Sequence, residues 1–136
     1  MFLPKSEVFK DLRQEAINEI SEVAVEETYE EGSTLFAVGS PANNFYMLVQ
    51  GSVQVTIGEN SRKKYVVSNL GETFGWSSLV GNDFYTAKAH CLTPTKVLKI
   101  DKSELEKVFD AHERSGRTFF RTLARQLGQR LIDMHS

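Results

Sequence analysis

The stretch YEEGSTLFAVGSPANNFYMLVQGSVQV, residues 29–55, decides the fold. Its short runs of β-branched and aromatic residues, such as FYMLVQ and SVQV, are separated by glycines. Glycine tolerates the positive φ angles of tight turns, so this pattern predicts short strands joined by sharp corners. The pattern continues to residue 101, and seven of the nine glycines contribute to it: Gly32, Gly39, Gly51, Gly58, Gly71, Gly75 and Gly81. Residues 23–101 are therefore expected to form a sandwich, jelly roll or barrel.

Helical patterns flank this strand-rich stretch on both sides. On the N-terminal side, apolar residues recur at helical spacing and predict an amphipathic helix over residues 6–21: Phe9, Leu12, Ala16, Ile17 and Ile20. On the C-terminal side, DKSELEKVFDAHE and SGRTFFRTLARQLGQRLIDM predict two further helices. Ser103, paired with Glu106 in a capping box, and Ser115 are the candidate N-caps of these two helices.

Composition indicates one cytoplasmic domain of ordinary make-up. The 136 residues are 40% hydrophobic and 25% charged, with a formal net charge of -2. No apolar run approaches the roughly 20 residues of a membrane span, and the N-terminus lacks the features of a secretion signal. The single cysteine, Cys91, excludes an internal disulfide and fits a reducing compartment. The acidic first 31 residues and the arginines of residues 113–130 are interpreted as solvated helix faces.

The last predicted helix carries an apolar seam with the alternating three- and four-residue steps of a coiled coil. Its residues are the candidate dimer interface: Phe120, Leu123, Ala124, Leu127, Leu131 and Met134. A homodimer that pairs this helix with its twin is expected. The alternative is that the same face packs on the β core of its own chain.

The spacing of the glycines resembles that of the cyclic-nucleotide-binding domain, found in catabolite-activator-type regulators, cyclic-nucleotide-dependent kinases and gated channels. Gly32, Gly39, Tyr46 and Gly51 match the family positions, and NLGETFG and TAKAHCLTPTKVLKI match the segments further along. The resemblance implies a mainly β fold: an eight-stranded jelly-roll β-roll (a double-stranded β-helix) with one helix before it and two after it. It implies a single domain, 1–136, with the N-terminal helix in 1–22, the roll in 23–101 and the C-terminal helices in 102–136.

An unrelated jelly roll of the cupin type is the alternative fold. Cupins hold a metal through clustered histidines and an acid. Here His90, His112 and His135 lie far apart along the chain, and the last two fall in the predicted helical tail. No local metal motif is present, and neither a metal nor a cofactor is expected.

The resemblance also implies a phosphate-binding cassette. In the family, a short helix points backbone N–H groups at the cyclic phosphate, where the helix dipole also favours an anion. A glutamate just after a phenylalanine–glycine pair accepts the ribose 2′-hydroxyl, and an arginine opening the next strand pairs with the phosphate. The candidate ligand-binding residues at the matching positions are Phe74, Gly75, Trp76, Ser77, Ser78, Tyr85, Thr86 and Ala87.

This sequence departs from the family at both charged positions. Trp76 stands at the glutamate position and Tyr85 at the arginine position. Ser77 and Ser78 still offer hydroxyl donors, although Ser77 is equally interpreted as an N-cap. Lys88, the nearest cation, falls on the opposite strand face from Tyr85. We expect Trp76 and Tyr85 to line an aromatic pocket; the alternative is that both rings pack into the core.

These features predict a non-catalytic sensory or regulatory module with altered ligand specificity. It is expected to bind a small nucleotide-like or aromatic ligand, and cyclic AMP or cyclic GMP weakly or not at all. The alternative function is a homodimeric protein-interaction module without a small ligand. No helix-turn-helix follows the last predicted helix, so the chain alone is expected not to bind DNA, and its signal would pass to an effector protein.

Overall fold

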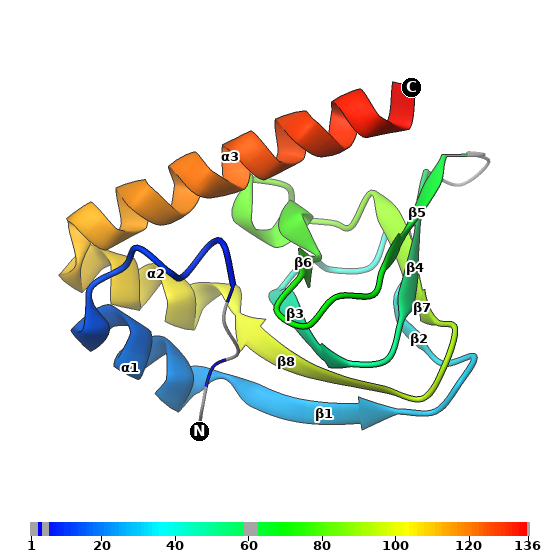
Figure 1. The fold of residues 1–136 in the computed structure, drawn as a ribbon, viewed down its shortest axis with the longest axis horizontal. Helices are drawn as coiled ribbons and strands as arrows, with labels where there is room; N and C mark the ends of the chain where they lie inside the picture. The colour runs from blue at the N-terminus through cyan, green and yellow to red at the C-terminus, as the bar shows by residue number, and fades with distance from the viewer. Residues whose placement is uncertain (1–2, 4–5, 59–62, 136) are drawn as a thin grey trace.

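A computed structural model describes residues 3, 6–58 and 63–135 of the chain. Eight strands form two four-stranded antiparallel sheets, ordered β1-β8-β3-β6 and β2-β7-β4-β5 (Figure 1). The strands are β1 (Val25–Tyr29), β2 (Thr34–Phe36), β3 (Asn44–Gln50), β4 (Val53–Ile57), β5 (Lys64–Val67), β6 (Thr73–Phe74), β7 (Ala87–Cys91) and β8 (Thr95–Asp101). The helices are α1 (Gln14–Val23), the 3-10 helix η1 (Trp76–Leu79), α2 (Lys102–Ala111) and α3 (Glu113–His135). The predicted β-roll with one N-terminal and two C-terminal helices is confirmed.

Strand β3 connects the two halves of the core because both of its faces are buried. Phe45 and Met47 point to a cluster that the sheet shares with the helices, called here the helix-side cluster. Tyr46 and Leu48 point to a cluster between the two sheets, called here the inter-sheet cluster. Side chains alternate across a strand, so a strand buried on both faces reads as a continuous apolar run. The run FYMLV in the sequence is explained by this position.

The helices cover the outer face of the first sheet around Phe119. This ring is fully buried and lies 5.7 Å from the ring of Phe9, 5.8 Å from Phe45 and 5.0 Å from Phe109, measured between centroids. The segment before α1 is thereby attached to both α3 and the roll. Figure 1 shows this N-terminal segment, drawn in dark blue, lying close to α2 and α3.

The first helix is shorter than its apolar spacing predicted. The helix expected over 6–21 begins only at Gln14, and residues 7–12 form turns. Phe9 and Leu12 are buried in the helix-side cluster as the pattern indicated. The pattern therefore identified the buried face correctly, but turns that place the same residues inward satisfy it equally well.

Both predicted N-caps are wrong. Asp101 caps α2, and its carboxylate accepts hydrogen bonds from the backbone N–H groups of Ser103 at 2.9 Å and Glu104 at 3.2 Å. The Ser103 hydroxyl also donates to Asp101, and this bond holds the pKa of Asp101 below its usual value. Ser115 lies inside α3, where its buried hydroxyl accepts from the N–H of Arg13, the residue preceding α1. The Ser115 hydroxyl therefore makes a long-range contact with Arg13 instead of capping its own helix.

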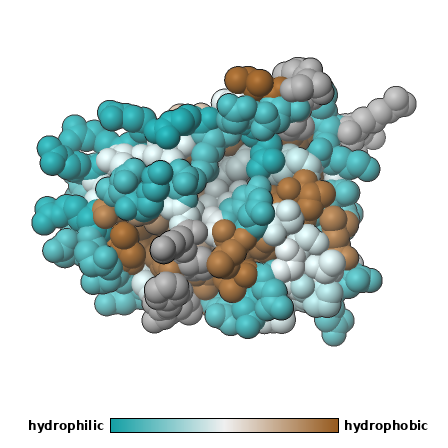
Figure 2. All heavy atoms as spheres, in the orientation of Figure 1, coloured by the Kyte–Doolittle hydropathy of each residue, from teal (hydrophilic) through white to brown (hydrophobic). Residues whose placement is uncertain are grey.

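The seam on α3 divides between core and surface. Leu123 is only 1% exposed and belongs to the helix-side cluster, and Leu127 packs partly against that cluster. Phe120 is 40% exposed, Leu131 is 60% exposed, and Ala124 is also exposed. The side chain of Met134 lies outside the described residues. Hydrophilic residues cover most of α3 in Figure 2, with a hydrophobic group near its C-terminal part.

No helix in the described part of the chain is both long enough and apolar enough to cross a membrane.

Candidate functional site

The cassette region begins with a turn that requires glycine. Gly75 follows β6 and has φ 78°, a left-handed conformation that residues with a Cβ adopt at a cost. A Cβ at this position would lie 2.9 Å from Cδ2 of Tyr46. Gly75 is the N-cap of η1, a single 3-10 turn of four residues. So short a helix sums few peptide dipoles, which weakens the attraction for an anion that the family resemblance implied.

The two serines of η1 are used differently. The buried Ser78 hydroxyl donates to the carbonyl oxygen of Gly75 at 3.1 Å, so it stabilises the turn. The Ser77 hydroxyl lies 3.3 Å from the Thr86 hydroxyl in an exposed position. Ser77 and Thr86 therefore form the one solvent-facing hydroxyl pair among the eight candidate residues.

Tyr85 is a core residue. Its ring is 4% exposed and stacks on Phe36 with centroids 3.9 Å apart and planes at 14°. Its hydroxyl donates to the carbonyl oxygen of Asn44 at 2.6 Å and accepts from the N–H of Asn44 at 3.2 Å. Burial raises the pKa of Tyr85, so the phenol remains neutral. Both functions of the hydroxyl are used within the chain, which matches the alternative that this ring packs as core.

Trp76 lies apart from Tyr85. Its indole N–H donates to Oγ1 of Thr73 at 3.2 Å, and its ring stacks on Tyr65 with centroids 6.0 Å apart and planes at 12°. Trp76 packs against the helix-side cluster, whereas Tyr85 belongs to the cluster between the sheets. The structure does not bring the two rings together, so the expected pocket lined by both is not formed.

The remaining candidates are also mostly structural. Phe74 is fully buried and stacks on Tyr46 at 5.2 Å, and Ala87 packs partly against the same inter-sheet cluster. Lys88 is exposed on the other face of β7, as strand alternation predicted. Most of the candidate side chains therefore pack in the core or stabilise the turn.

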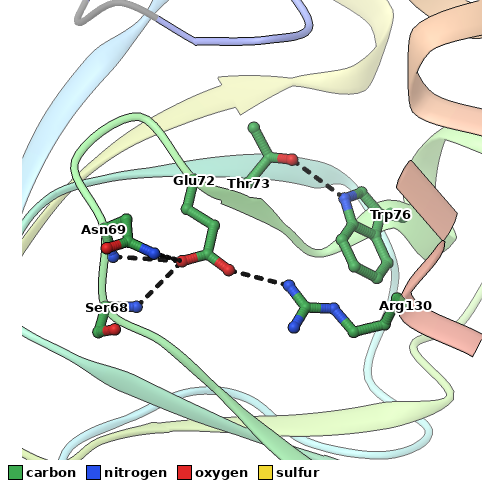
Figure 3. A network of polar contacts seen from close by, with 6 residues as sticks. All are labelled: Ser68, Asn69, Glu72, Thr73, Trp76 and Arg130. Atoms are coloured by element: carbon green, nitrogen blue, oxygen red, sulfur yellow. Dashed lines mark hydrogen bonds and ion pairs between the residues drawn. The ribbon is translucent and has the colours of Figure 1, made fainter. Parts of the chain in front are cut away.

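A large cavity lies beside the cassette, between the N-terminal segment, the β5–β6 connection and α3. Its volume is about 1030 Å³. Of the eight candidate residues only Trp76 lines it; other lining residues are Phe9, Ile17, Asn69, Glu72 and Arg130. Figure 3 shows the network at its edge, where the Arg130 guanidinium pairs with the Glu72 carboxylate at 2.9 Å.

Arg130 and Glu72 were missed at the level of sequence. Arg130 belongs to an arginine run interpreted as a solvated helix face, and Glu72 belongs to a stretch matched for its glycines. One local signal was available: Leu123, Leu127 and Arg130 follow the i, i+4, i+7 spacing of a single helix face. An arginine that continues a buried face needs a partner, because an unpaired charge there is costly.

Within the described ranges, no group of three or more histidine, cysteine, aspartate or glutamate side chains is arranged to hold a metal ion.

Comparison with known proteins agrees with this geometry. Residues 26–112 match the family model described as "Cyclic nucleotide-binding domain". The chain is 28% identical over 111 residues to the cGMP-dependent protein kinase egl-4 of Caenorhabditis briggsae, covering 79% of this chain and 15% of the kinase. It therefore spans about one seventh of that relative.

Two solved structures share the fold. One, described as a cyclic nucleotide-binding protein from Geobacter metallireducens GS-15, superposes with a TM-score of 0.78 at 25% identity, covering 91% of each chain. The other is the catabolite activator protein of Thermus thermophilus, with a TM-score of 0.77 at 19% identity, covering 96% of this chain and 62% of that one.

Proposed function

The chain belongs to the cyclic nucleotide-binding domain family, and from this premise we propose that it is a regulatory module whose cassette binds cyclic AMP and cyclic GMP weakly or not at all. The proposed role is sensing rather than catalysis. The proposal includes a cytoplasmic location, a small ligand of altered type and an effector protein that receives the signal.

The main support for this proposal is that Tyr85, at the position of the family's arginine, is bonded to the backbone of its own chain. A phosphate in the family site needs a cation at this position, and a phenol whose hydroxyl is bonded to the Asn44 backbone offers none. Trp76 cannot accept a hydrogen bond from a ribose hydroxyl, because indole has only a donor. Losing a bidentate charged partner from a desolvated site costs about 2–5 kcal/mol, which is about 30-fold to several thousand-fold in affinity.

We expect isothermal calorimetry to show no saturable binding of cyclic GMP or cyclic AMP below about 100 µM, given that loss. Cyclic GMP is tested first, because the kinase relative is named as cGMP-dependent. 5′-GMP serves as the control for non-cyclic phosphate binding. Micromolar affinity for either cyclic nucleotide would contradict the proposal, since it would show that the missing arginine is compensated.

A second candidate function is the homodimeric interaction module. The exposed side chains of Phe120, Ala124 and Leu131 on α3 favour it, because they share one stripe of the helix. Leu131 is the suitable test position: it is 60% exposed, whereas Leu127 also packs on the core of its own chain.

If α3 pairs with its twin, Leu131→Glu should convert a dimer into a folded monomer, because two carboxylates would face each other across the seam. Light scattering at micromolar concentration measures the mass. Arg125→Glu is the matched control, because Arg125 is exposed on a different side of α3. A monomeric parent chain, or a Leu131→Glu variant that remains dimeric, would rule out this interface.

A further inference from the structure

The glutamate in the Glu72–Arg130 pair is held in place by its own loop. Oε1 of Glu72 accepts hydrogen bonds from the backbone N–H groups of Ser68 and Asn69 at 3.2 Å and from the Asn69 side-chain amide at 3.3 Å. Oε2 faces Arg130 at 2.9 Å (Figure 3). Because the first oxygen is bound locally, the carboxylate keeps its orientation whether or not Arg130 is present.

Arg130 contacts both the Glu72 carboxylate and the ring of Tyr65. Its guanidinium carbon lies 4.1 Å from the centroid of the Tyr65 ring, a cation–π contact, and its long side chain reaches the pair from α3. The Arg130 and Glu72 side chains are 25% and 21% exposed, so both line the cavity while remaining partly shielded from water. Retraction of Arg130 would open a gap with an acid on one side and a guanidinium on the other.

The charges around the cavity decide what fits this gap. Three acids and two bases line it, for a formal sum of -1: Glu7, Glu72 and Asp133 against Lys10 and Arg130. An anion such as a nucleotide phosphate would therefore enter a site with excess negative charge. A simple cation would satisfy Glu72 but leave Arg130 without its partner, which is costly in a partly desolvated site. A ligand with one positive and one negative group replaces both partners at once.

The rest of the lining is suited to an apolar or aromatic group. Phe9, Ile17 and Trp76 line the same cavity as the ion pair. Trp76 is held in place by its bond to Thr73 and by stacking on Tyr65. Ligand sites in proteins combine such apolar walls with a few fixed polar groups in volumes of about 300–1000 Å³. The volume of this cavity, about 1030 Å³, is just above that range.

We propose that this cavity binds a small zwitterion of the α-amino-acid class with an aromatic side chain. The ligand carboxylate forms a bidentate pair with Arg130, the ligand ammonium bonds to the anchored carboxylate of Glu72, and the ring packs near Trp76. This inference rests on the proposed function only in that the module senses a small ligand other than a cyclic nucleotide.

The test is calorimetry of the whole chain with four probes. L-phenylalanine and L-tryptophan carry both charges, 3-phenylpropionate lacks the ammonium, and phenethylamine lacks the carboxylate. We expect at least one of the two amino acids to bind with a dissociation constant below about 1 mM, and each single-charge probe to bind at least about tenfold more weakly.

Variants identify the site. Arg130→Gln and Glu72→Gln should each weaken amino-acid binding at least about tenfold, because each leaves one charge of the ligand unpaired. Arg125→Gln removes an exposed arginine of the same helix and should leave the affinity unchanged. Thermal unfolding of every variant confirms that the chain is folded.

The inference is overturned if neither amino acid binds at 1 mM ligand, if 3-phenylpropionate or phenethylamine binds as well as the amino acids, or if Arg125→Gln weakens binding as much as Arg130→Gln. None of these results bears on the cassette, since the cavity and the cassette share only Trp76. Micromolar binding of a cyclic nucleotide would contradict the proposed function and leave the cavity result standing.

Discussion

Tyr85→Arg is expected to lower the free energy of unfolding by about 3–5 kcal/mol, because it buries a charge without a partner. The arginine would replace a ring that is 4% exposed and stacked on Phe36 between the two sheets. It would also leave the Asn44 carbonyl and N–H groups without the hydroxyl that now bonds them. Urea denaturation followed by fluorescence measures the change.

Tyr85→Phe is the matched control for this prediction. It keeps the ring and removes only the hydroxyl, so we expect a loss of about 1–3 kcal/mol from the unsatisfied Asn44 groups. A double variant that restores both charged residues of the family site could contradict this prediction. If Tyr85→Arg combined with Trp76→Glu stays as stable as the parent chain and gains at least tenfold in cyclic-nucleotide affinity, then the cassette is a convertible site and Tyr85 is not essential to the core.

Gly51→Ala is expected to destabilise the fold by about 3–5 kcal/mol through backbone strain and overpacking together. Gly51 turns the chain from β3 to β4 at φ 99°. An added Cβ would collide with the carbonyl oxygen of Pro94 and would lie 2.9 Å from Cα of Thr95. These are backbone atoms of the β7–β8 corner, so they cannot move aside as a flexible side chain would.

Gly32→Ala separates the two causes. Gly32 also has a positive φ, 86°, but a Cβ there would meet nothing within 4 Å. Only the conformational strain applies, so a loss of about 1–2 kcal/mol is expected. Equal losses at Gly51 and Gly32 in the same urea experiment would show that the close approach of the two corners does not limit stability.

The fold could be predicted from the sequence because the features that indicate it, glycine turns and short apolar runs, are local and repeated along the chain. Each glycine corner follows from the φ angle of its own residue, and the run FYMLV in β3 requires burial on both faces wherever the strand lies. Because these features are local, they also explain why the extent of the first helix was predicted wrongly. The spacing over residues 6–21 identified Phe9, Leu12, Ala16 and Ile20 as buried and Ile17 as partly buried, but turns satisfied it as well as a helix until Gln14.

The candidate site was harder to predict from the sequence, because the role of a side chain depends on which segments pack beside it. At the family positions, Trp76 and Tyr85 appeared equivalent: two rings replacing two charges. Packing placed Trp76 at the edge of the cavity and Tyr85 between the sheets. No local sequence pattern around Trp76 in η1 or around Tyr85 in the segment before β7 distinguishes these outcomes, since both rings are compatible with burial.

By itself, the sequence determined the class of fold, its flanking helices and its family, and it predicted that the cassette lacks the two charged groups of the family site. Only the tertiary structure decided that Glu72 meets Arg130, 58 residues further along the chain, beside a cavity. The physical reason is that turns and strand faces depend on interactions between near neighbours. An ion pair depends instead on the docking of α3 on the roll, which is decided by the packing of the whole core.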